Sequence, residues 1–128
     1  MAQVLGTKGG ELDLLIKQGA TFGPHLITLK DSNGTAINIT GATIRSQIRK
    51  LSNSASPACT GDFVLTSPTN GQFTFGFSSA STTSLIVDPD SESGSDSQYV
   101  WDMELQYADG RVYPLMYGKV QVFREVTK

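Results

Sequence analysis

The amino-acid sequence predicts an all-β protein, built as an antiparallel β-sandwich of seven to eight strands. The first observation is a series of segments, running from residue 11 to the C-terminus, in which apolar and polar residues alternate with the period of a strand. The second is a set of turn signals between these segments, at residues 31–34, 69–71 and 109–110. The third is the length of 128 residues, which suits one domain with one hydrophobic core. A small closed barrel is the alternative architecture.

Charged residues are sparse and unevenly distributed along the chain. They make up 17% of the sequence, and the net charge of −2 argues against a generally basic nucleic-acid-binding protein. All ten Lys and Arg residues lie outside residues 51–110, whereas eight acidic residues lie inside that region. Hairpins that bring the two regions together would place acidic and basic side chains side by side, so that no side of the molecule carries an excess of one charge. The alternative is a dipolar subunit whose acidic side meets the basic side of a neighbour.

The N-terminal segment differs from the rest of the chain. Residues 1–10 have no periodicity and contain two consecutive glycines at their end, which predicts a flexible arm. Such an arm either frays or becomes ordered against a neighbouring subunit. The remainder, residues 11–128, is predicted to form a single β-sandwich domain. No signal peptide and no apolar run of membrane-spanning length is expected.

Two strands are predicted before the first turn. Residues 11–17 alternate in polarity and place three apolar side chains on one face, those of Leu12, Leu14 and Ile16. Residues 21–30 form the second predicted strand, which contains Pro24. Because proline has no N–H to donate to a neighbouring strand, we expect an edge position or a bulge there.

A short segment at 36–39 and a strand at 42–49 are predicted after the first turn. The longer segment has apolar and small residues on one face and places Arg45 and Arg49 on the other. Two arginines spaced in this way along a strand suit an extended acidic partner surface better than a single phosphate. An ordinary solvated strand face is the alternative interpretation.

The next two strands are predicted to form a hairpin. Residues 62–65 and 72–77 flank a Pro- and Gly-containing turn at 68–71. Gly76 indicates a bulge or a close approach of another backbone. Three aromatic side chains alternate along the second strand and are expected in the core rather than on a binding surface: Phe73, Phe75 and Phe77.

Residues 88–97 predict an exposed acidic loop. This segment does not match a calcium-binding EF-hand, because the positions that require Gly and Glu hold Ser93 and Tyr99. Its acidic side chains are, with Arg45 and Arg49, our candidates for contacts with a partner: Asp88, Asp90, Glu92 and Asp96.

Three further strands complete the predicted domain. Residues 98–107 alternate most clearly, and a tight turn at 109–110 leads into 111–117. Gly118 is expected to interrupt the chain before the last strand, 119–126. Seven or eight strands with antiparallel links, and no segment predicted as a helix, lead us to expect a sandwich of the immunoglobulin-like type.

The sequence gives no pattern that is typical of an active site. With one His (His25) and one Cys (Cys59), neither a Ser-His-Asp nor a Cys-His arrangement can be argued. Asp102 and Glu104 share a strand face, but that face is expected in solvent. We therefore predict a protein that is not an enzyme, with no catalytic residues, no cofactor and no metal site.

The order of several motifs resembles that of small β-sandwich structural proteins of tailed bacteriophages. It is also similar to the N-terminal domain of phage upper baseplate proteins, which anchors receptor-binding parts to the tail. The resemblance covers about residues 11–127. The segments that carry it are 18–22 (QGATF), 29–49 (LKDSNGTAINITGATIRSQIR), 99–105 (YVWDMEL), 109–110 (DG) and 118–127 (GKVQVFREVT).

This resemblance implies a virion structural protein that is made in the host cytoplasm and assembled into the tail or baseplate. It would link wedge or fibre components through protein–protein contacts, in several copies or as a homo-oligomer, without binding nucleic acid or membrane. A head decoration protein, bound to the capsid, is the alternative within phages. A carbohydrate- or receptor-binding module is the alternative from another class, with Tyr113 and Tyr117 as expected contacts.

Overall fold

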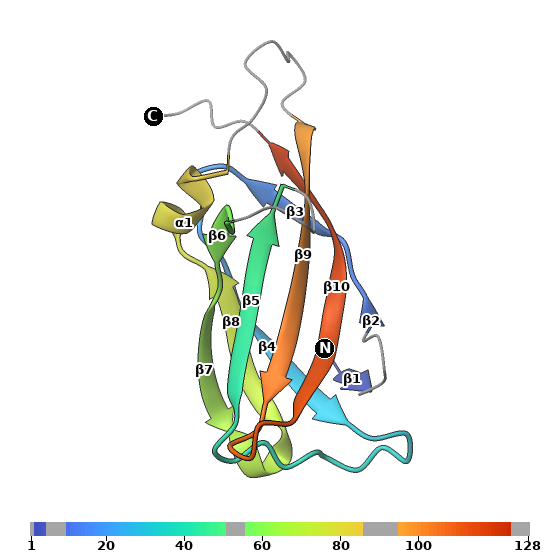
Figure 1. The fold of residues 1–128 in the computed structure, drawn as a ribbon. Helices are drawn as coiled ribbons and strands as arrows, with labels where there is room; N and C mark the ends of the chain where they lie inside the picture. Colours follow the sequence, from blue (N-terminus) through green and yellow to red (C-terminus); the bar gives the residue numbers. More distant parts are fainter. Residues whose placement is uncertain (1, 5–9, 51–55, 86–94, 124–128) are drawn as a thin grey trace.

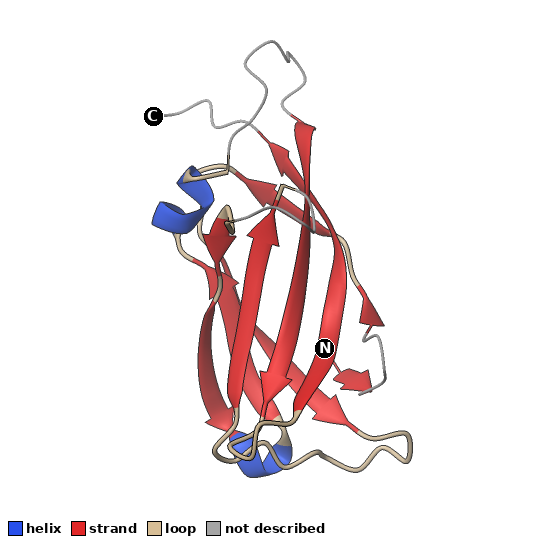
Figure 2. Ribbon diagram, viewed as in Figure 1, coloured by secondary structure: helices blue, strands red, loops and turns tan. Residues whose placement is uncertain are grey.

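Two β-sheets pack face to face in the computed structural model, which describes residues 2–4, 10–50, 56–85 and 95–123 (Figure 1). The four-stranded sheet has the order β1 (Ala2–Val4), β4 (Phe22–Lys30), β8 (Gln72–Phe77) and β7 (Asp62–Ser67). The six-stranded sheet has the order β2 (Gly10–Glu11), β10 (Val112–Phe123), β9 (Ser95–Gln106), β5 (Thr43–Arg49) and β6 (Cys59–Thr60), and β3 (Leu14–Lys17) also pairs with β10. Strands make up most of the described chain (Figure 2). The prediction of an all-β sandwich is confirmed.

The hydrophobic core lies between the two sheets. Phe73, Phe75 and Phe77 on β8 are buried, as their alternation predicts. The Phe75 ring stacks on that of Trp101 from the other sheet, with centroids 6.0 Å apart and an interplanar angle of 4°. Further apolar side chains from the six-stranded sheet complete this layer, among them Leu14, Ile16, Ile44, Ile48, Met103, Leu105, Val120 and Val122.

The bulge predicted at Pro24 is present in β4. The register of β4 with β8 shifts between Phe22 and His25 and is regular beyond that point. Gly76 of β8 lies against this irregular stretch, and a Cβ atom there would overlap the Phe22 carbonyl oxygen. The close backbone approach predicted from Gly76 is therefore also confirmed, while β4 itself lies between β1 and β8.

The predicted hairpin of β7 and β8 is confirmed. A single 3₁₀ turn, η1 (Pro68–Asn70), connects the two strands. Gly71 follows with a φ of 69°, in the left-handed region that glycine adopts without strain. A Cβ atom at Gly71 would lie 2.6 Å from the Leu29 carbonyl oxygen, so this position also needs glycine for space.

A short helix, α1 (Ser79–Thr83), occurs where the sequence predicts none. Serine and threonine are weak helix formers, so the segment gives no helical signal of its own. The Ser78 hydroxyl accepts a hydrogen bond from the Ser81 N–H at 3.1 Å, and the Thr82 hydroxyl donates to the Ala20 carbonyl at 2.8 Å. A cap and a tertiary contact thus hold the turn. Within the described residues, no helix is long and apolar enough to cross a membrane.

The strands β9 and β10 are longer than predicted. The strand β9 begins at Ser95, inside the segment predicted as a loop, and β10 continues through Gly118 without interruption. The prediction that Gly118 separates two strands is wrong, because this residue pairs with Trp101 in the ladder. The ladder instead has a bulge between Pro114 and Met116.

The N-terminal strands pair in parallel, which the predicted antiparallel arrangement did not include. The strand β1 pairs with residues 28–30 of β4, while β2 and β3 pair with β10. The short segment at 36–39 forms one isolated bridge, between Lys30 and Ala36. The chain there is held instead by backbone hydrogen bonds from Ile37 to Leu29 and from Ile39 to Pro68.

Candidate functional site

The outer face of the six-stranded sheet carries polar side chains in rows that run across the strands. The alternation in β5, β9 and β10 turns apolar residues toward the core and polar residues outward. The register places Gln47, Asp102 and Tyr117 in one row, which Glu11 of β2 extends. The two adjacent rows pair Arg45 with Glu104 and Pro114, and Arg49 with Val100 and Lys119.

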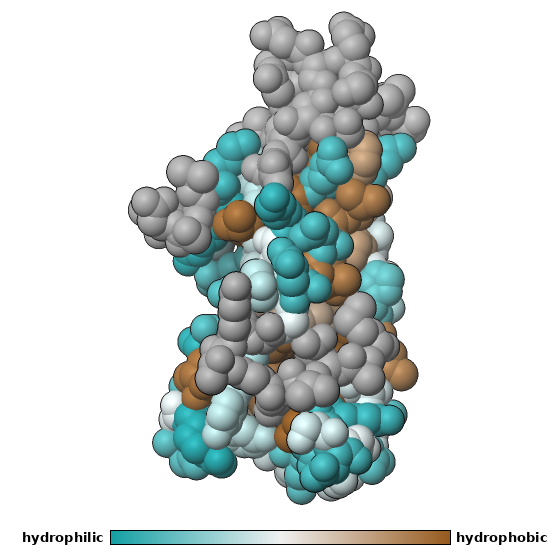
Figure 3. All heavy atoms as spheres, turned by 90° about the vertical axis from the view of Figure 1, so that its right-hand side faces the viewer, coloured by the Kyte–Doolittle hydropathy of each residue, from teal (hydrophilic) through white to brown (hydrophobic). Residues whose placement is uncertain are grey.

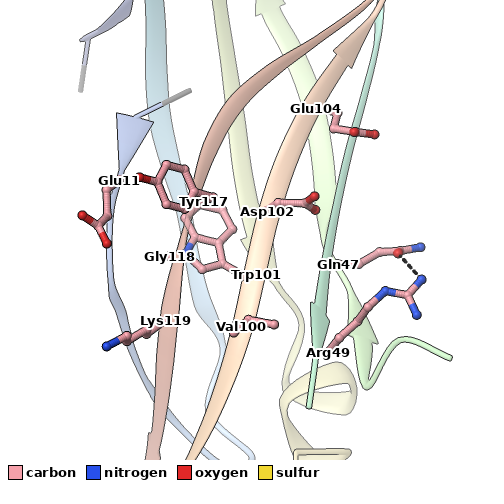
Figure 4. Close-up of a pocket in the computed structure, with 10 residues that line it drawn as sticks. All are labelled: Glu11, Gln47, Arg49, Val100, Trp101, Asp102, Glu104, Tyr117, Gly118 and Lys119. Atoms are coloured by element: carbon pink, nitrogen blue, oxygen red, sulfur yellow. Dashed lines mark hydrogen bonds between the residues drawn. The ribbon is translucent and has the colours of Figure 1, made fainter. Parts of the chain in front are cut away.

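A groove of about 600 Å³ crosses this face, and we call it the outer groove (Figure 4). Asp102 lies between Tyr117 on one side and Gln47 on the other. The side of the molecule that carries β1 and β2 shows hydrophilic and hydrophobic residues interspersed (Figure 3). The outer groove is lined by Glu11, Gln47, Arg49, Val100, Trp101, Asp102, Glu104, Tyr117, Gly118 and Lys119.

Both arginines predicted as contact residues lie on the outer face of β5, as their spacing indicates. The Arg45 guanidinium forms an ion pair with the Glu104 carboxylate of β9 at 2.8 Å. Arg49 donates a hydrogen bond to the Gln47 side-chain oxygen, also at 2.8 Å. The two side chains are therefore positioned by neighbours on the same face, and their role in contacts with a partner stays a prediction.

The Asp102 carboxyl is the acidic group at the middle of the outer groove. Desolvation by its surroundings raises its pKa above the ordinary value for aspartate, although part of the side chain is exposed, and the nearby Glu104 carboxylate raises the pKa further. Arg49 and Arg45 act in the opposite direction with smaller effects. No described residue forms a hydrogen bond or an ion pair with this carboxylate. Asp102 therefore retains acceptor capacity that is directed into the groove.

Most of the predicted acidic contact residues lie outside the part of the chain that the structure describes. Asp88, Asp90 and Glu92 lie outside the described residues. Asp96 belongs to β9, but its side chain is not among those described. The structure therefore brings Arg45 and Arg49 together on one face and does not test the acidic half of the predicted contact surface.

Several groove residues could not be identified from sequence periodicity. Glu11 reaches the groove only because β2 pairs in parallel with residues 116–117 of β10. Tyr117 and Lys119 face outward after the bulge in β10, which the alternation alone does not locate. The sequence does single out Tyr117 as an aromatic contact for a carbohydrate, and the structure places it in the groove.

Tyr113, the other aromatic candidate, lies in a separate cluster at the β9–β10 turn. Its ring meets that of Tyr107 edge-on, with centroids 5.8 Å apart. The Arg111 guanidinium lies 4.7 Å from the centre of the Tyr107 ring and pairs with Asp109 at 2.7 Å. These contacts order the turn, and Tyr113 does not line the outer groove.

Cys59 is a buried thiol on β6, in the six-stranded sheet. Burial raises the pKa of its thiol to about 11, and the Asp62 carboxylate acts in the same direction. In the part of the chain that the structure describes, no three His, Cys, Asp or Glu side chains form a group that could hold a metal ion.

A scan against models of protein families found no match, and a search of curated proteins found no similar sequence.

Proposed function

We propose that the chain is a structural protein of a tailed-phage virion, a tail or baseplate component that links wedge or fibre parts. The order of motifs between residues 18 and 127 supports this proposal through its resemblance to small phage structural proteins. The immunoglobulin-like type of sandwich, which displays two broad faces and several strand edges, belongs to the same proposal.

The observation that carries the proposal is the way in which the N-terminal segment joins the fold. The strand β1 adds to the edge of β4 through only three residues, paired with positions 28–30. Such strand addition relies on backbone hydrogen bonds and is a recurring mode of association between chains. The same segment can therefore add to a sheet edge of a neighbouring subunit, and β7 offers such an edge at the other end of the sheet.

Immunogold labelling tests the location directly. Antibody against this chain is expected to label intact particles of the phage that encodes it at the tail tip. Gold over the head would replace the baseplate assignment with that of a decoration protein. Absence of gold from both intact and disrupted particles would contradict the virion assignment altogether.

Deletion of residues 1–9 tests the N-terminal arm, because it removes β1 and keeps the strand β2. We expect the truncated chain to enter particles about tenfold less efficiently, the factor that corresponds to roughly 1.4 kcal/mol of lost contact. Its circular dichroism spectrum should match that of the full chain, because β1 contributes only a three-residue pairing. The measurement is the amount of chain per purified particle in competition with the full-length protein, and equal incorporation would rule out a role for the arm.

A further inference from the structure

The outer groove has the size and shape of a binding site for a small polar molecule. Its volume of about 600 Å³ lies within the range of roughly 300–1,000 Å³ that is typical of such sites. Four strands contribute to it, β2, β5, β9 and β10, so its lining is held by sheet pairing rather than by a loop. A site on paired strands keeps its geometry when no ligand is bound.

The charges around the groove balance one another. Three acidic groups, those of Glu11, Asp102 and Glu104, line it. They are matched by the cationic Arg49 and Lys119 in the groove and by Arg45, which lines a smaller hollow adjoining it. A ligand with a strong net charge would gain little from a site with this balance, whereas a neutral ligand with many hydrogen-bonding groups would find both donors and acceptors.

The polar groups at the middle of the groove suit hydroxyl ligands. The Asp102 carboxylate accepts no hydrogen bond from a described residue, so both of its oxygens can accept hydroxyl protons. On the β5 side the Gln47 amide and the Arg49 guanidinium supply donors, and the hydrogen bond between them fixes their orientation. A hydroxyl group donates one proton and accepts at its oxygen, so it can bridge these two kinds of group.

An aromatic ring adjoins these polar groups. Tyr117 is half-buried and occupies the same row as Asp102. Its ring can cover the face of a ligand that presents C–H groups, as aromatic side chains do in sites that combine apolar contact with hydrogen bonding. Val100 in the adjacent row adds an apolar surface beside it.

We propose that the outer groove binds a neutral sugar unit of a glycan, with Asp102, Gln47 and Arg49 on its hydroxyl groups and Tyr117 against its C–H face. Monosaccharides combine a rim of hydroxyl groups with an apolar face, which is the combination that the groove presents. This site goes beyond the proposed structural role, and it can exist on the isolated chain whether or not the chain enters a virion.

The test is a titration of the ¹⁵N-labelled full chain, followed by two-dimensional NMR. Glucose, galactose and N-acetylglucosamine are the neutral probes, and glucuronic acid, galacturonic acid and glucosamine are their respective charged counterparts. At least one neutral sugar is expected to shift the backbone amide signals of residues in the groove, and more strongly than its charged counterpart. Shifts that are absent with all three neutral sugars would overturn the proposal, and tighter binding of a charged probe would overturn the choice of a neutral ligand.

Three variants assign the binding to the groove. Asp102→Asn and Tyr117→Ala should each weaken the binding of the neutral sugar about tenfold, through loss of a charged acceptor or of the stacking surface. Tyr113→Ala is the matched control, since this tyrosine lies on the same strand but outside the groove, and it should leave the affinity unchanged. The dispersion of the spectrum shows that each variant is folded. Equal affinity in all three variants would place the sugar elsewhere and contradict the proposal.

Discussion

At the scale of single residues, the lack of a side chain at Gly118 leaves room for a contact between Leu12 and Trp101. The Leu12 carbonyl oxygen accepts a hydrogen bond from the Trp101 indole N–H at 2.7 Å, and it does so in the space that a side chain at Gly118 would fill. The Leu12 N–H in turn donates to the Tyr117 carbonyl at 2.8 Å. Gly118, which the sequence predicts to interrupt the strand, therefore leaves space for Leu12, whose hydrogen bonds hold the N-terminal segment to the core residue Trp101 and to Tyr117 of the groove.

Replacing Gly118 by a residue with a side chain should destabilise the fold. We expect Gly118→Ala to lower the free energy of unfolding by about 3 kcal/mol, because the new methyl group meets backbone atoms that cannot move freely and the Trp101 hydrogen bond is disturbed. Gly34→Ala is the control: it has a φ of 82° and no atom within 4 Å of its added Cβ, so it should cost only about 1 kcal/mol. Urea denaturation measures both, and equal costs would contradict the proposed overlap.

Ser46 presents the opposite case, a polar group without a partner. Its side chain is 1% exposed, and its hydroxyl forms no hydrogen bond with any described residue. Because a buried hydroxyl without a partner is unfavourable, Ser46→Ala should raise the free energy of unfolding by about 1 kcal/mol. Ser78→Ala serves as a comparison and should lower it by a similar amount, since that hydroxyl caps α1. Thermal denaturation distinguishes the two, and destabilisation by Ser46→Ala would contradict our interpretation.

At the scale of elements, local patterns predict those strands whose neighbours are close in sequence. The alternation in β5, the hairpin of β7 and β8, and the turn at 109–110 are all visible in the sequence. The parallel pairing of β2 and β3 with β10 is not, because partners about a hundred positions apart leave no local signal. The outer groove draws on both ends of the chain. The sequence therefore predicts Arg45 and Arg49 on one face of β5, but it does not predict the groove that Arg49 lines.

The ladder between β5 and β9 permits a measurement of one cross-strand pair. Arg45 and Glu104 are 52% and 37% exposed, so we expect a coupling energy of only about 0.5 kcal/mol from a double-mutant cycle with Arg45→Ala and Glu104→Ala. The coupling should fall with added salt, because exposed charges are screened. The uncharged row of Thr43 and Gln106 is the matched control and should show no salt dependence. A coupling that salt leaves unchanged would mean that the pair is not electrostatic.

At the scale of the whole molecule, burial of Cys59 makes the free energy of unfolding depend on pH in the alkaline range. The thiol titrates near its ordinary value of 9.0 in the unfolded chain and at about 11 in the folded protein. The folded state therefore holds this proton more tightly, and its contribution to stability is complete below pH 9 and is lost as the pH rises to about 11. The free energy of unfolding that is lost through this thiol over the whole pH range should not exceed about 3 kcal/mol.

The contribution of this one group can be separated by comparison with Cys59→Ala. Both proteins share all other titrating groups, so the difference between their unfolding free energies should be constant up to pH 9. It should then shrink toward pH 11, as the free thiol of the unfolded chain ionises. A difference that stays constant over the whole range would show that the thiol ionises equally well in the folded protein.

The bulge in β10 has a consequence for the molecule as a whole. Pro114 lies opposite Glu104 and Met116 opposite Met103, so Leu115 is one residue more than the ladder requires, and it is buried together with Met116. The bulge thus lets two consecutive side chains enter the core, and it keeps every later residue of the strand on the side of the sheet that its partner on β9 faces. A deletion of Leu115 would make Pro114 and Met116 neighbours opposite Glu104 and Met103, so the ladder would become regular. Val120 and Val122 would then stay in the core, and Tyr117 and Lys119 would stay on the outer face.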